Sequence, residues 1–181
     1  MFVATEFIEG EVLSTVACRG CLTANQAARI GRDIALAIAA LWNERLVHRD
    51  IKPNNIMLAR NGRVVMIDLG VARHLSMGAL TTLGKTWGTE GYMSPEQAKA
   101  LRQLSCKSDI FSLGIVLQEL LLGRHPTGCN QLALSGGGIK TRALKLTLPI
   151  PIEALLDAML ALSPHNRPNP IDAADFLNKH I

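Results

Sequence analysis

The residues best suited to chemistry lie in two short polar segments. The first, residues 48–55, places a carboxylate, a cation and an amide close together at Asp50, Lys52 and Asn55. The second segment begins at Asp68. Carboxylate and amide oxygens are suitable ligands for a divalent cation, and a nearby lysine can neutralise a phosphoryl group. If the two segments meet, their residue types suit phosphoryl transfer, which needs positioning and charge neutralisation rather than covalent help from the protein.

Two predicted strands, 56–58 and 64–67, connect these segments. Between the strands lies Asn61-Gly62, a dipeptide that is a strong signal for a tight hairpin turn. The hairpin folds the chain back on itself, so Asp68 is expected to approach the first polar segment.

Helical patterns surround this hairpin. Thr23 and Gln26 fit a capping box, which marks the start of a helix. Residues 108–122 are apolar on nearly every side, which predicts a central buried helix that ends at Gly123. The helix that follows the capping box buries one face, where these apolar residues recur at helical spacing: Ile30, Ile34, Ala37, Ile38 and Leu41.

The two ends of the chain and its middle complete the inventory. Residues 3–8 resemble a short apolar strand, and 152–162 and 171–177 are predicted as two final helices. The stretch from 69 to 96 has little periodicity, and a loop of that length in a compact domain usually has a function. The inventory is mainly α with one small β-hairpin.

Five motifs resemble those of eukaryotic-type (Hanks-type) serine/threonine protein kinases and occur in the same order as in that family. The sequence around residues 88–98 is similar to that of the bacterial branch. Residues 48–55 resemble the catalytic loop H-R-D-x-K-x-x-N. Asp68-Leu69-Gly70 resembles the metal-binding D-F-G, and residues 88–96 resemble the end of an activation segment. Residues 109–114 resemble the start of the family's central helix, and Arg167 resembles the arginine that pairs with the glutamate of Ala-Pro-Glu, here Glu96.

The resemblance implies a partial protein kinase domain over residues 1–181, with the mainly α C-terminal lobe of the α+β kinase fold. It implies a hinge at 3–10, a catalytic loop at 48–55, an activation segment at 68–96 and a helical lobe to 181. The small hairpin carries the catalytic and metal-binding loops. We expect the N-terminal lobe, with its Gly-rich loop and strand lysine, to be absent from this sequence.

The resemblance also assigns catalytic roles. Asp50 would accept or orient the proton of the substrate hydroxyl, and Lys52 would stabilise charge on the transferring phosphate. Thr89 would pack beside both and help to position a Ser/Thr protein substrate. Asn55 and Asp68 would bind Mg²⁺ ions that bridge the ATP phosphates.

Further roles concern the nucleotide and regulation. The backbone near Glu6 and Ile8 would pair with the adenine of ATP, and Met57 would form the floor of the adenine pocket. Arg49 would bind a phosphorylated activation loop through a charge-assisted pair. The candidate phosphorylation sites, among which the sequence does not choose, are Thr81, Thr82 and Thr86.

Composition argues against other classes of function. The net charge is +4, but no cluster of Lys and Arg forms a nucleic-acid footprint. Cys18 and Cys21 lack the second ligand pair that a zinc site needs. The longest apolar run, 110–123, contains Gln118 and Glu119 and is too short to span a bilayer. We therefore expect a cytoplasmic protein without nucleic-acid partners, and the sequence leaves its substrate and oligomeric state open.

Two alternatives to a truncated kinase remain. The chain could be a catalytically inactive kinase-like lobe that binds other proteins, although the intact polar residues of the two segments argue against decay. It could also be a small-molecule phosphotransferase such as an aminoglycoside kinase. Those enzymes typically lack the Gly-Thr…Ser-Pro-Glu segment and carry glycine where Arg49 stands, which disfavours this alternative.

The 181-residue chain by itself is expected to bind ATP weakly and to transfer phosphate negligibly. The reason is that no Gly-rich loop or strand lysine in this sequence would enclose the phosphates, and catalysis depends on such preorganisation. Calorimetry with MgATP measures this directly. Tight magnesium-dependent binding would contradict the expectation.

Overall fold

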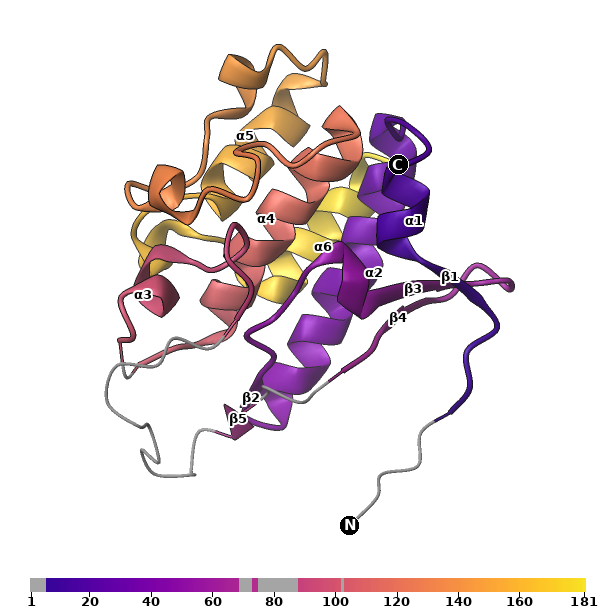
Figure 1. The fold of residues 1–181 in the computed structure, drawn as a ribbon, viewed down its shortest axis with the longest axis horizontal. Coiled ribbons are helices and arrows are strands. Elements are labelled where there is room, and N and C mark those ends of the chain that lie inside the picture. The colour runs from indigo at the N-terminus through magenta and orange to yellow at the C-terminus, as the bar shows by residue number, and fades with distance from the viewer. Residues whose placement is uncertain (1–5, 69–72, 75–87, 102) are drawn as a thin grey trace.

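The computed structural model describes residues 6–68, 73–74, 88–101 and 103–181. Its centre is a group of helices, with a small sheet at one side (Figure 1). Helix α2 (Ala24–Asn43) begins at the predicted capping box: the Thr23 hydroxyl accepts from the Gln26 N–H at 3.3 Å, and Gln26 Oε1 accepts from the Thr23 N–H at 2.9 Å. Its buried face packs against α4 and α6.

Helix α4 (Cys106–Leu122) is the most buried helix of the described chain. It is capped by the Ser105 hydroxyl and ends at Gly123, whose φ of +68° is the left-handed conformation that glycine adopts readily. The helix lies between α2 and α5 (Ile150–Met159), and it also contacts α6 (Pro170–Lys179) (Figure 1). The prediction of a central apolar helix is confirmed.

The small sheet has the order β1-β3-β4, and all its pairs are antiparallel. Its strands are β1 (Gly10–Val12), β3 (Ile56–Ala59) and β4 (Val64–Met66). The predicted hairpin joins β3 to β4, with Gly62 at φ +85° in the turn. A second sheet has two strands, β2 (Leu46–Val47) and β5 (Arg73–His74), and lies at the C-terminal end of α2 (Figure 1).

The predicted strand at 3–8 was wrong for the residues that can be described. Residues 6–9 form no strand, 1–5 lie outside the described residues, and the strand is Gly10–Val12 instead. The pairing with β3 decides its place, because Gly10 is opposite Ala59 and the Glu9 carbonyl accepts from the Arg60 N–H at 2.9 Å. A short helix that was not predicted, α1 (Leu13–Ala17), follows at once.

The remaining elements are short. Helix α3 (Pro95–Ala98) is capped by the Ser94 hydroxyl, and η1 (Pro53–Asn55) leads into β3. The other 3-10 turns are η2 (Gln131–Leu134), η3 (Thr141–Leu144) and η4 (Pro164–Asn166). Across the described ranges, no helix combines the length and apolar character needed to cross a bilayer.

Candidate active site

The polar loop at 48–55 is held from inside the protein by α4. The carboxylate of Asp109, which is 1% exposed, accepts from the backbone N–H groups of His48 and Arg49, both at 2.9 Å. Arg49 has φ +71°, a conformation that costs energy for a side chain other than glycine. From α3, Gln97 donates to the Arg49 carbonyl at 2.5 Å. The loop backbone is therefore fixed at both its amide and carbonyl groups.

Four predicted site residues meet in this loop: Asp50, Lys52, Asn55 and Thr89, which we call the Asp50 cluster. The Thr89 hydroxyl donates to Asp50 Oδ1 at 2.6 Å and accepts from Lys52 Nζ at 2.5 Å. Lys52 Nζ also lies 2.8 Å from Asp50 Oδ2. Asn55 Nδ2 donates to the carbonyl and to Oδ2 of Asp50, both at 2.9 Å. Thr89 is thus brought into contact with a loop that lies far from it in the sequence.

The charge of Asp50 is stabilised by its neighbours. Burial acts to raise the pKa of the carboxyl, but hydrogen bonds from Lys52 and Thr89 outweigh it, and the pKa lies below its ordinary value of 3.8. Asp50 is therefore ionised at neutral pH and can accept a hydrogen bond from a hydroxyl group. Its contribution to stability is present above pH 3.8 and is lost as the pH falls through its folded pKa.

Asp68 follows β4 on the side of the hairpin that returns to the loop. The Ile67 N–H donates to the Asn55 carbonyl at 2.9 Å, so the end of β4 lies beside the loop, as the hairpin predicted. Burial lowers the pKa of the His48 imidazole, and the negative charge of Asp68 opposes this effect. Asp68 is exposed and has φ +63°.

The donor set suits a hard cation. Asn55 uses its amide nitrogen toward Asp50, which leaves its Oδ1 as the atom that could ligate a metal. One amide oxygen and the Asp68 carboxylate fit Mg²⁺, which keeps several waters and takes substrate phosphates as ligands. Within the described ranges there is no group of three or more His, Cys, Asp or Glu that would form an all-protein metal site.

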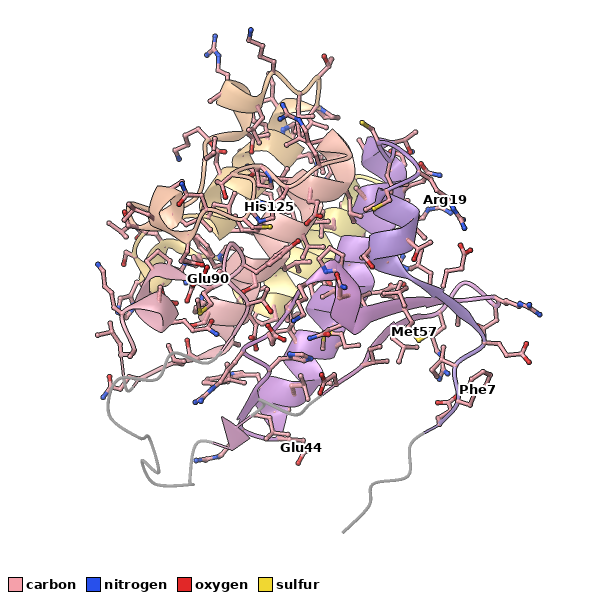
Figure 2. The ribbon with its side chains drawn as sticks, in the orientation of Figure 1. Phe7, Arg19, Glu44, Met57, Glu90 and His125 are labelled. Atoms are coloured by element: carbon pink, nitrogen blue, oxygen red, sulfur yellow. The ribbon has the colours of Figure 1, made fainter. Side chains whose placement is uncertain are left out.

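The residues predicted to contact adenine lie outside the Asp50 cluster: Met57 is in the sheet, and Glu6 and Ile8 precede its first strand. Met57 is half-buried on β3, opposite Val12 of β1. The Glu6 side chain forms an ion pair with Arg63 at 2.6 Å, and Ile8 is half-buried. Figure 2 shows Met57 on the same side of the molecule as Phe7, where the chain leads into β1. Leu69, Gly70 and the candidate phosphorylation sites Thr81, Thr82 and Thr86 lie outside the described residues.

A buried ion pair joins Glu96 of α3 to Arg167, which lies between η4 and α6. Arg167 binds Glu96 through two nitrogens at 2.6 and 2.9 Å, and its side chain is 0% exposed. All three guanidinium nitrogens of Arg167 also donate to backbone carbonyls, and the Ser108 hydroxyl donates to Glu96 at 2.7 Å. Burial acts to raise the pKa of Glu96, but the guanidinium outweighs it and the pKa is lowered. The geometry agrees with the structural ion pair expected from the sequence.

Sequence reasoning missed some residues that shape the site. Gln97 holds the Arg49 carbonyl, and Gln131 binds both the Gly91 N–H at 2.9 Å and the Met93 carbonyl at 2.8 Å. Gln97 lies in the segment 88–98 whose sequence resembles the bacterial branch, but the resemblance gave it no role, and Gln131 belongs to no motif. Single glutamines also carry no periodic signal. Only their tertiary contacts reveal them.

The Asp109 carboxyl provides a test of this loop anchor. Burial raises its pKa to about 6, against the opposing effect of the Arg49 and His48 N–H donors. Its contribution to stability is therefore greatest below the ordinary pKa of 3.8 and is lost as the pH rises through about 6. We expect the ¹³C signal of this carboxyl, assigned by its loss in Asp109→Asn, to titrate near pH 6. A midpoint at or below 3.8 would contradict this burial.

Comparison with known proteins agrees with the geometry. The family described as "Protein kinase domain" matches residues 1–180. Serine/threonine-protein kinase PrkC of Bacillus subtilis is 40% identical over 126 residues, which are 69% of this chain and 19% of PrkC. PknA of Corynebacterium glutamicum is 36% identical over 136 residues, 74% of this chain and 29% of PknA.

A third relative matches almost the whole chain. Serine/threonine-protein kinase AfsK of Streptomyces coelicolor is 31% identical over 182 residues, 99% of this chain and 23% of AfsK. The chain thus spans between 19 and 29% of the length of these three relatives. The family match covers nearly every residue, and the relatives are bacterial kinases of the eukaryotic type. The chain belongs to the protein kinase family.

Proposed function

We propose that this chain carries the catalytic loop of a serine/threonine protein kinase, which transfers the γ-phosphate of ATP to Ser and Thr hydroxyls of proteins. The observation that supports this most is the Asp50 cluster. There a carboxylate, an ammonium group and a threonine hydroxyl lie within 2.5–2.8 Å of one another. The names of the relatives, all serine/threonine-protein kinases, point the same way.

In this proposal Asp50 accepts the proton of the substrate hydroxyl. The hydroxyl oxygen forms a bond to the γ-phosphorus, the bond from that phosphorus to the β,γ-bridging oxygen breaks, and ADP leaves. Thr89 and Asn55 hold the Asp50 carboxylate in place through their hydrogen bonds. Lys52, already paired with Asp50, adds positive charge next to the phosphoryl group in transit.

Mg²⁺ and ATP complete the proposed site. Asn55 Oδ1 and the Asp68 carboxylate would hold the metal, which supplies neutralisation of charge on the phosphate oxygens when bound. The backbone near Glu6 and Ile8 would receive the adenine, with Met57 below it. Asn55 directly precedes β3 and Asp68 follows β4, so the two proposed ligands flank one short hairpin.

A phosphoamino-acid assay tests the function. The native polypeptide that contains these residues is incubated with MgATP and a generic protein substrate such as casein or myelin basic protein. We expect phosphoserine and phosphothreonine without phosphotyrosine. Phosphate transfer to a small-molecule hydroxyl with none to protein would overturn the proposal, as would the absence of any transfer from a polypeptide that binds MgATP tightly.

A further inference from the structure

A tight turn connects the Asp50 cluster to the rest of the segment that ends at α3. The Tyr92 N–H donates to the Thr89 carbonyl at 3.1 Å, and Gly91 within the turn has φ +87°. We call residues 89–92 the Thr89 turn. Since Thr89 contacts both Asp50 and Lys52, a shift of this turn would move the Thr89 hydroxyl relative to the carboxylate that it holds.

Two side chains from beyond α4 hold the Thr89 turn. His125 Nε2 lies 3.1 Å from the Gly91 carbonyl oxygen. Gln131 accepts from the Gly91 N–H and donates to the Met93 carbonyl. The packing here is close, because a Cβ placed on Gly91 would lie 2.6 Å from Cys129 Cα and 3.0 Å from His125 Nε2. The loop after α4 therefore fits directly against the turn (Figure 2).

The hydrogen bonds of His125 require one protonation state. Its Nδ1 accepts from the backbone N–H of Thr127 at 3.1 Å and of Cys129 at 2.9 Å. Nδ1 must therefore carry no proton, and the single ring proton lies on Nε2, which donates to the Gly91 carbonyl. A doubly protonated ring would direct its Nδ1–H at two backbone N–H donors and would keep only the Thr127 hydroxyl, 3.3 Å away, as an acceptor. Protonation therefore destabilises this loop conformation.

We propose that neutral His125 is a positioning residue for the reaction, which fixes the Thr89 turn and through it the Thr89–Asp50 contact. Protonation of His125 releases the loop 125–129 and loosens the turn. The protein substrate must approach Asp50 beside Thr89, so the loosened turn weakens protein-substrate binding and leaves ATP binding unchanged. The effect on the reaction depends on the proposed kinase function, whereas the effect on the turn does not.

The groups around His125 set the pH at which this happens. Tyr92, from the turn, contacts the ring edge-to-face with centroids 4.9 Å apart, and its hydroxyl donates to Glu119 of α4 at 2.6 Å. The backbone N–H of Cys129, in the same loop, donates to Nδ1. Arg124, which precedes His125, and Glu90, which precedes Gly91, are both exposed. Burial lowers the pKa of His125 below 6.5, so the stabilisation is present above 6.5 and is lost as the pH falls through the folded pKa.

We call the release of the loop 125–129 on protonation of His125 the His125 switch. It is tested by amide hydrogen exchange and imidazole ¹⁵N shifts of the 181-residue chain, measured from pH 5 to 8. We expect the Nε2–H tautomer above the midpoint of His125. Below it, protection factors of the Cys129 and Gly91 amides should fall roughly tenfold or more, in step with the His125 titration.

Three variants make the exchange test specific. In His125→Asn the side-chain oxygen still accepts from the loop but cannot be protonated, so we expect protection that does not depend on pH over this range. In His125→Phe the ring remains against Tyr92 but the acceptor is gone, so protection should be low throughout. His165→Asn, at an exposed histidine, should behave as the wild type. Equal Gly91 and Cys129 protection in wild type and His125→Phe would overturn the proposal.

Kinetics of the native polypeptide then test the link to the reaction. At pH 7.5 we expect His125→Phe to raise KM for the protein substrate by roughly tenfold, or to lower kcat/KM by that factor, while KM for ATP stays the same. His125→Asn, which keeps the acceptor for the loop but lacks the Nε2–H donor to the Gly91 carbonyl, should show a smaller loss than His125→Phe. If His125→Phe loses amide protection at Gly91 and Cys129 but keeps the wild-type KM and kcat/KM for the protein substrate, the positioning role is overturned. A wild type without phosphate transfer would refute the kinase function, and the exchange experiment would still decide the switch.

Discussion

Replacing Asp50 with Asn is expected to lower phosphate transfer to protein by roughly a hundred- to ten-thousandfold, the range that a general base contributes. The amide keeps the size of the side chain, and it can still accept from Thr89 through its oxygen. It cannot, however, take the substrate proton, and it removes the charge that pairs with Lys52. Initial rates with saturating MgATP, measured on the native polypeptide, give the loss directly.

The control for Asp50→Asn is the same chemical change at Asp175, an exposed residue of α6. This variant should keep the wild-type rate. Circular dichroism should give the same spectrum for both variants, because Asp50 lies on a loop that Asp109 and Gln97 hold by its backbone. A fully active Asp50→Asn protein would remove Asp50 from the reaction.

Arg167→Met is expected to destabilise the protein by about 3–5 kcal/mol, the usual cost of removing one partner of a buried ion pair. The substitution leaves Glu96 charged and buried, with Ser108 as its remaining side-chain donor among the described residues. It also leaves the backbone carbonyls of Ala161, Lys107 and Leu162 without the guanidinium. Urea denaturation of wild type and variant measures the difference in the free energy of unfolding.

Two further variants separate burial from the ion pair itself. Arg19→Met removes an equally close bidentate pair with Glu11, at 2.6 and 2.8 Å, but both side chains are exposed, and the stability should not change measurably. In the double variant Glu96→Gln, Arg167→Met the buried charge is gone, so part of the lost stability should return. Similar losses for Arg167→Met and Arg19→Met would show that burial is not what makes this pair important.

The parts of the fold that depend on local signals could be predicted from the sequence. The capping box at Thr23, the turn at Gly62 and the left-handed stop at Gly123 all lie where the sequence indicated. Strand β1 and the pair β2–β5 could not be predicted in this way. Their residues form strands because a partner strand lies beside them, and a partner distant in the chain leaves no mark on local periodicity.

The candidate site divides in the same way. Residue types and motif order predicted that Asp50, Lys52 and Asn55 share a loop, and the resemblance placed Thr89 with them. The contacts that hold the site rigid could not be predicted, because Gln97 and Gln131 act through hydrogen bonds to backbone groups that are distant in the sequence. A histidine after a helix, such as His125, looks the same in sequence whether it is solvated or satisfies three backbone groups.

The attachment of the loop to Asp109 has a consequence for how the protein tolerates sequence change. Asp109 lies in the first turn of α4, the helix around which the apolar core is built. The geometry of the Asp50 cluster is therefore part of the same cooperative unit as the core, and the two should be lost together when the protein unfolds. Asn54, the exposed residue of the loop, should then tolerate substitution without a change in the loop backbone. Substitutions deep in the core, by contrast, would reduce activity mainly by lowering the fraction of folded molecules.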